Sequence, residues 1–200
     1  MSQTKIKAGG FDVDVITGTT ALAEAPASTD EFLISDGGVL KRLDASYIGG
    51  DNTPSFMVVK TSAQSISNNT ATKVTWDSEL KDSDSAFASE KFTVPSGEGG
   101  DYYIFSTILM DSKNNSDLKN CYIKLYKNGS MLQQHVYDFR ANQPRRMAID
   151  LTGVHTLSAT DYLEMYAQID SDDGDVEVDG ASSGDGYLTI FGGFKLIWVI

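Results

Sequence analysis

Cysteine and histidine are nearly absent from this sequence, which has one cysteine, Cys121, and two histidines, His135 and His155, in 200 residues. A single cysteine cannot form an intrachain disulfide, so the fold is not built on a disulfide framework. Cys121 begins an alternating apolar segment, and we expect it to be a buried small hydrophobe. The two histidines lie far apart in the sequence without a recognisable nucleophile and base, so we interpret them as surface or packing residues and predict a non-enzymatic protein.

Basic residues are few beside acidic ones: 16 lysines and arginines accompany 28 aspartates and glutamates, a formal net charge of −12. Binding to nucleic acid needs clustered lysine and arginine to neutralise phosphates, so nucleic acid is excluded as an expected partner. An anionic membrane surface is disfavoured for the same reason.

Long apolar runs are also missing. No run approaches the roughly 20 residues that a membrane-spanning helix needs, so we predict no membrane insertion. The first five residues, Met-Ser-Gln-Thr-Lys, are not followed by an apolar segment of the kind found in secretory signals. We expect a protein made in the cytoplasm and not exported by a cleaved signal.

What the sequence does contain is a series of short segments with strand character. Alternation of apolar and polar residues, separated by Gly, Asn, Asp and Pro turns, predicts antiparallel strands. No segment has helical periodicity over ten or more residues. The expected strands after Pro54 are 56–59, 73–76, 91–94, 102–110, 121–127, 131–139, 147–151, 162–169 and 187–200. Many short strands of this kind indicate an all-β sandwich or barrel.

The first 50 residues differ from the rest. Residues 11–15 alternate with a period of two, which predicts a strand, and residues 32–40 carry a Ser-Asp-Gly-Gly turn between apolar pairs, which predicts a β-hairpin. Residues 49–54 have the composition of a linker. We therefore predict an N-terminal hairpin module over 1–50 and a sandwich domain over 51–200.

Several motifs of the second region resemble a known family. They are Phe-Thr-Val-Pro at 92–95, Gly-Asp-Tyr-Tyr-Ile-Phe at 100–105, Ile-Lys-Leu-Tyr-Lys-Asn-Gly at 123–129, Leu-Ser-Ala-Thr-Asp-Tyr-Leu at 157–163 and Leu-Thr-Ile-Phe-Gly-Gly-Phe-Lys-Leu at 188–196. Their order and spacing resemble a C1q/TNF-like globular domain over residues 54–200. The sequence departs from the family pattern at Thr160, where a glycine usually precedes Asp161, and it has no collagen-like Gly-X-Y stalk.

The resemblance implies an antiparallel jelly-roll sandwich that associates as a threefold homotrimer. The residues expected in the trimer interface or the core are Tyr102, Tyr103, Phe105, Phe191, Phe194 and Trp198. In the closing strand, Phe194, Leu196 and Trp198 are expected on one face and Ile197 on the other, so that both faces are covered. A monomeric sandwich whose last strand is central is the alternative.

The N-terminal segment 29–43, which contains Asp-Glu-Phe-Leu-Ile-Ser-Asp-Gly-Gly-Val-Leu-Lys-Arg, is similar to short units of bacteriophage fibre and virion proteins. It predicts a virion structural protein whose residues 1–50 dock to other virion proteins. Two versions stay open, a capsid decoration or head-fibre protein and a short tail fibre that binds a host cell-surface glycan. The alternative is a soluble C1q/TNF-like carbohydrate- or ligand-binding protein outside any virion.

An acidic loop at 170–179 is the one polar cluster that suggests an ion. Its carboxylates Asp170, Asp172, Asp173 and Asp175 are of the type that Ca²⁺ prefers, but their spacing is not that of an EF-hand. We expect a solvated loop, with a Ca²⁺ site at these residues as the alternative and no other cofactor.

Overall fold

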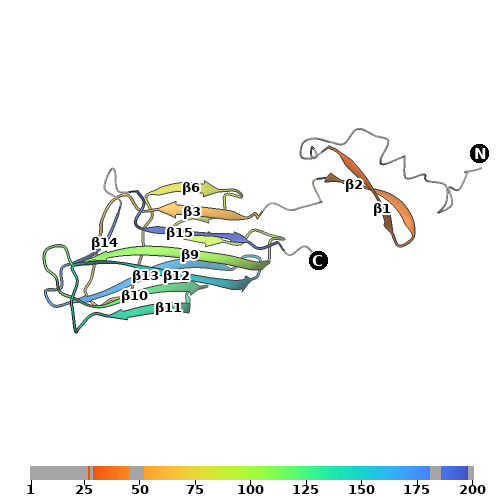
Figure 1. Ribbon diagram of the computed structural model, residues 1–200. Helices are drawn as coiled ribbons and strands as arrows, with labels where there is room; N and C mark the ends of the chain where they lie inside the picture. The colour runs from red at the N-terminus through yellow and green to blue at the C-terminus, as the bar shows by residue number, and fades with distance from the viewer. Residues whose placement is uncertain (1–26, 28, 46–51, 181–185, 198–200) are drawn as a thin grey trace, which may run out of the picture. The chain divides into compact units, whose positions relative to one another are not determined.

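The computed structural model describes residues 27, 29–45, 52–180 and 186–197 (Figure 1). It divides the chain into two compact units, Met1–Gly50 and Asp51–Ile200, which are described separately below. Within the described ranges the regular elements are all β-strands, and none of the described residues forms a helix long and apolar enough to cross a membrane. The strand predicted over 11–15 lies outside the described residues.

The first unit contains a two-stranded antiparallel hairpin. Strand β1 (Glu31–Asp36) pairs with β2 (Val39–Asp44) in a register that leaves Gly37 and Gly38 as a two-residue turn. Both glycines have positive φ angles, 58° and 80°, which is the conformation that a tight hairpin turn requires and that glycine adopts at no steric cost. The predicted hairpin is confirmed. Four of its apolar side chains are exposed: Phe32, Leu33, Val39 and Leu40.

The second unit is a sandwich of two antiparallel sheets. The first sheet contains β3 (Ser55–Val59), β4 (Gln64–Ile66), β6 (Ser78–Asp82), β9 (Gly100–Asp111), β12 (Arg146–Leu157), β14 (Val176–Asp179) and β15 (Ile190–Lys195). The second sheet contains β5 (Thr72–Lys73), β7 (Phe87–Ala88), β8 (Lys91–Thr93), β10 (Leu118–Lys127), β11 (Ser130–Asp138) and β13 (Tyr162–Ser171). In Figure 1 the first sheet is followed easily from β6 through β3 and β15 to β9.

The order of the strands defines the sandwich as a jelly roll. We number β3, β8, β9, β10, β11, β12, β13 and β15 from one to eight along the chain. In the first sheet these strands then lie in the order 1-8-3-6, and in the second in the order 2-7-4-5. Alternating placement of this kind between two sheets is the double Greek key of a jelly roll. The predicted all-β antiparallel jelly-roll sandwich is confirmed.

The core lies between the two sheets and follows the alternation of the strands. Along β13, Leu163, Met165, Ala167 and Ile169 are fully buried, whereas the residues between them face outward or are partly exposed. An aromatic cluster joins the sheets at one place: the ring centroids of Phe56 and Phe92 are 4.3 Å apart, and those of Phe56 and Phe191 are 4.9 Å apart. Cys121 is buried in this core, as expected, and burial raises the pKa of its thiol to about 12.

Three expectations about strands were wrong in detail. The segment expected at 73–76 forms only the two-residue strand β5, because Val74 and Trp76 lie in an irregular stretch that packs on the core. The closing strand ends at Lys195, so Leu196 and Ile197 do not alternate across a sheet as predicted. The expected acidic loop contains strand β14, in which Val176 and Val178 point into the core while Glu177 and Asp179 do not.

Candidate functional site

An aromatic surface occupies part of the outward side of the first sheet. Because side chains alternate along β9, Tyr102 and Ile104 are buried in the core and Tyr103 and Phe105 face outward. On the neighbouring strand β15, Phe194 faces the same way, and its ring centroid lies 5.5 Å from that of Tyr103. The ring of Phe105 follows at 6.2 Å from Tyr103.

Two aliphatic residues extend this surface. Val154 is aligned with Tyr103 across β12 and is 56% exposed, and Met57 is aligned with Gly192 and Phe105 across β3 and β15. We call Met57, Tyr103, Phe105, Val154 and Phe194 the aromatic face. A hollow of about 360 Å³ opens on it, lined by Met57, Phe105, Phe194 and their neighbours.

Glycine at position 192 makes this surface possible. A Cβ atom at Gly192 would lie 2.5 Å from the Cζ atom of Phe105 and 2.9 Å from the carbonyl oxygen of Phe56. The ring of Phe105 therefore lies against the backbone of β15, in space that a side chain at position 192 would fill.

The structure separates the predicted interface and core residues into two groups. Tyr102 and Phe191 are fully buried inside the sandwich, whereas Tyr103, Phe105 and Phe194 lie on the aromatic face. Trp198 lies outside the described residues.

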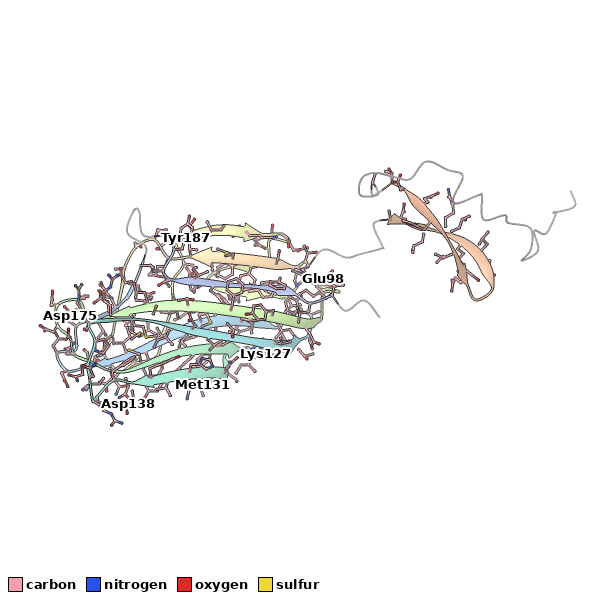
Figure 2. All side chains as sticks on the ribbon, viewed as in Figure 1. Glu98, Lys127, Met131, Asp138, Asp175 and Tyr187 are labelled. Carbon is pink, nitrogen blue, oxygen red and sulfur yellow. The ribbon has the colours of Figure 1, made fainter. Side chains whose placement is uncertain are left out.

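The carboxylates considered for Ca²⁺ each have a neighbouring partner in the chain. Lys119 lies 3.3 Å from Asp170 and 3.1 Å from Asp172, Asn115 donates a 2.7 Å hydrogen bond to Asp173, and Lys113 lies 2.7 Å from Asp175. Figure 2 shows Asp175 at the end of the sandwich opposite Glu98. The solvated loop stays the prediction, with a Ca²⁺ site at these four residues as its alternative.

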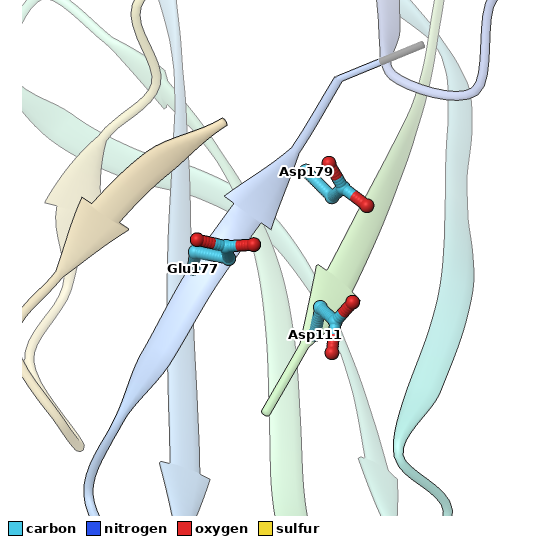
Figure 3. A group of neighbouring side chains, drawn as sticks. All are labelled: Asp111, Glu177 and Asp179. Carbon is cyan, nitrogen blue, oxygen red and sulfur yellow. The ribbon is translucent and has the colours of Figure 1, made fainter. Parts of the chain in front are cut away.

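A different set of carboxylates converges on one point. Oxygen atoms of Asp111, Glu177 and Asp179 lie within 4.8 Å of one another, where β14 runs along the end of β9 (Figure 3). Burial raises the pKa of Glu177, and the nearby carboxylates add to this effect. The sequence interpretation missed this cluster because Asp111 is far from the other two residues in the chain.

Basic side chains already face this acidic cluster. The Nε atom of Arg146 lies 3.0 Å from Asp111, that of Arg145 lies 3.3 Å from Asp111, and Arg146 also pairs with Asp179. Lys113 lies 3.7 Å from Glu177. The cluster is thus an ion-pair network that fastens the start of β12 to β9 and β14.

The two histidines come together at the edge between the sheets, on β11 and β12. The Oε1 atom of Gln133 is 3.0 Å from the Nε2 atom of His155, and the Nδ1 atom of His135 donates a 2.8 Å hydrogen bond to the carbonyl of Asp150. Burial, assisted by the charge of Lys127, lowers the pKa of His155. The Nε2 atom of Gln133 lies 3.4 Å from the Nε2 atom of His135, so one amide contacts both imidazoles. This arrangement fits a packing role for both histidines.

No protein-family model matches the chain, and no curated protein matches it. Among solved structures, the chain is similar to the globular domain of zebrafish complement 1qA protein. The two share 14% sequence identity with a TM-score of 0.49, over 72% of this chain and 98% of that one.

Proposed function

We propose that this chain is a non-enzymatic structural protein on the surface of a bacteriophage particle, where it forms a homotrimer through its aromatic face. The observation that carries the proposal is the aromatic face itself. Tyr103, Phe105 and Phe194 form an outward aromatic cluster, and Val154 beside them is more than half exposed. The three rings are partly exposed. Contiguous apolar surface on the outward side of a sheet is typical of a protein interface, in which aromatic residues are enriched.

The hairpin unit supports the docking part of the proposal. An isolated two-stranded hairpin is marginally stable in water, because it buries little apolar surface. Here Leu33 and Leu40 are each 67% exposed. A partner surface on the particle would cover these side chains, and this agrees with the similarity of residues 29–43 to virion protein units.

Light scattering of the full-length protein tests the trimer. We expect a mass of about three times the 21.7 kDa of one chain at micromolar concentration. A monomeric mass under these conditions would remove the aromatic face as an assembly surface.

Cryo-electron microscopy of the parent particle tests the location. Density for the jelly roll at quasi-threefold capsid positions supports the decoration or head-fibre version, and density at the tail supports the short-fibre version. If the protein is absent from purified particles, the alternative is left, a ligand-binding protein outside any virion.

A further inference from the structure

The outward side of the second sheet, opposite the aromatic face, is built from tyrosine and lysine. Alternation along β10 and β13 buries Leu125 and Met165 and turns their neighbours outward. The tyrosines that face outward are Tyr122, Tyr126, Tyr162 and Tyr166, and the lysines beside them are Lys73, Lys91 and Lys124. We call these seven residues the tyrosine–lysine face.

Strand register interleaves the two residue types. Tyr166 is aligned with Lys73 on β5 and with Lys124 on β10, so one ring lies between two lysines. The rings of Tyr126 and Tyr166 are 4.3 Å apart between centroids. The Nζ atom of Lys91 lies 4.7 Å from the ring centroid of Tyr162, and that of Lys124 lies 5.1 Å from the centroid of Tyr122.

The charge of this face has the opposite sign to that of the chain. One carboxylate, that of Glu164, lies among the three lysines, and it is paired with Lys73 at 3.0 Å. In the described part of the chain Lys81, Lys91 and Lys124 are the basic residues without an ion-pair partner. Two of these three lie on the tyrosine–lysine face, in a protein with a net charge of −12.

Both ammonium groups are positioned against aromatic rings and have no carboxylate of their own. Burial lowers the pKa of Lys124, which means that water solvates its ammonium group incompletely. An incompletely solvated ammonium group attracts an incoming anion more strongly than one in bulk water, because the local dielectric constant is lower.

We propose that the tyrosine–lysine face binds an acidic polysaccharide, a polymer whose sugar units carry carboxylates. Sugar rings present C–H surfaces that pack on the tyrosine rings, and the carboxylates pair with Lys91 and Lys124. Gln168, which lies beside Tyr122 across the strands, holds Lys124 in place: its Oε1 atom accepts a hydrogen bond from the Lys124 ammonium group, and its Nε2 atom donates to Asn69. An open sheet surface with aligned residues suits an extended polymer, whereas a small molecule is usually held in a concave site.

This inference deepens the proposed surface role and rests on it for its biological setting, but its test uses the isolated protein. Binding of polysialic acid and of polygalacturonate is measured by isothermal calorimetry, with neutral dextran of matched length as the reference polymer. We expect binding of at least one acidic polymer, weakened by added salt because the contacts are ionic and partly exposed. Dextran is expected not to bind.

The double variant Lys91→Gln/Lys124→Gln removes both unpaired charges and keeps most of each side-chain stem. We expect its affinity for the acidic polymer to fall by about tenfold or more, since two charge-assisted contacts are lost and their partial exposure weakens each of them. The matched control is Lys81→Gln, which removes the third unpaired lysine, on β6 of the other sheet. Lys81 lines the hollow on the aromatic face, so the oligomeric mass of this variant is measured beside its affinity. Its affinity should stay within about twofold of the parent protein.

Three results would overturn the proposal: no binding of either acidic polymer, equal loss of affinity in Lys81→Gln, or equally tight binding of double-stranded DNA, which would indicate unspecific attraction of polyanions. Light scattering and circular dichroism on each variant separate these results from misfolding or loss of assembly. If the protein is monomeric yet binds the acidic polymer through Lys91 and Lys124, the trimer proposal fails and the binding proposal stands.

Discussion

Thr160 has a backbone conformation that its side chain disfavours. Its φ angle is 72°, in the left-handed region, and Thr160 precedes Asp161 at the turn between β12 and β13. A β-branched residue is a rare occupant of this region because its Cβ atom crowds the backbone. This explains in physical terms why the family pattern that the sequence resembles has glycine at this place.

We therefore expect Thr160→Gly to stabilise the sandwich. The left-handed conformation costs about 1–2 kcal/mol for a residue with a side chain. The greater freedom of glycine in the unfolded chain offsets about 0.5–1 kcal/mol of that. The free energy of unfolding, measured by urea denaturation, should rise by about 0.5–1 kcal/mol. Thr152→Gly, at an extended position of β12, should lower it by a similar amount, and equal effects of the two changes would contradict the argument.

The carboxylate of Asp161, the residue that follows Thr160, contacts residues of two turns. Lys127 lies 2.7 Å away, the backbone N–H of Ser158 donates a 2.8 Å hydrogen bond, and the Asn128 amide donates another of 2.7 Å. These contacts lower the pKa of Asp161 to about 2, and the contact with Lys127 has the largest effect.

A lowered pKa makes a stabilising contribution that depends on pH. The unfolded carboxyl titrates near pH 4, so the contribution is complete above that pH and is lost as the pH falls from about 4 to about 2. We expect unfolding free energies of the Asp161→Asn variant to fall less steeply over this interval than those of the parent protein. Parallel slopes in the two proteins would show that Asp161 has the same pKa in the folded and unfolded states.

At the scale of the element, β15 depends on its two adjacent glycines. The Cβ atom that Gly192 lacks would collide with Phe105, and that of Gly193 would lie 2.6 Å from the Cδ1 atom of Ile104 and 2.9 Å from the carbonyl of Tyr103. The strand therefore passes between an outward ring and the inward core, with no room for a side chain on either side.

Gly192→Ala should destabilise the protein by about 1–3 kcal/mol, the usual range for overpacking. The carbonyl oxygen of Phe56 is backbone and cannot yield as a flexible side chain would, so part of the strain has to be taken up by the sheet itself. Thermal or chemical denaturation measures the loss. The double variant Gly192→Ala/Phe105→Ala separates the contact with the Phe105 ring from the contact with the Phe56 carbonyl. Without the ring, the free energy of unfolding should recover by the part that the ring contact cost. If both variants lose the same stability, the whole loss comes from the contact with the backbone.

At the scale of the whole molecule, the jelly roll presents two outward surfaces of different chemistry. The first sheet carries the aromatic face, and the second carries the tyrosine–lysine face. Because the two surfaces lie on opposite sheets, assembly through one leaves the other free for a ligand.

A charged substitution on the aromatic face should therefore dissociate the proposed trimer without unfolding the chain. Val154 is 56% exposed, so Val154→Glu is compatible with the monomer fold, but burial of its carboxylate at an interface would cost several kcal/mol. Light scattering at micromolar concentration should show a mass near that of one chain. Leu33→Glu, which places the same charge on the hairpin unit, should leave the mass unchanged. A Val154→Glu protein that keeps the parent mass would place the interface elsewhere.

The sequence by itself determined the class of fold and most of the strands. Local features carry this information: alternation sets the faces of β9, β10 and β13, and positive-φ turns at Gly37–Gly38 and Asn128–Gly129 fix two hairpins. The sequence could not determine the short polar strands such as β6, because residues of an exposed edge strand show no alternation of apolar and polar side chains.

Only the tertiary structure decided which residues meet. It brought Phe194 beside Tyr103, brought Asp111 to Glu177 and Asp179, and aligned Lys73 and Lys124 on the two sides of Tyr166. The physical reason is that these neighbours belong to strands distant in the chain. Pairing between such strands follows from the packing of the whole core, and no local pattern of residues encodes it.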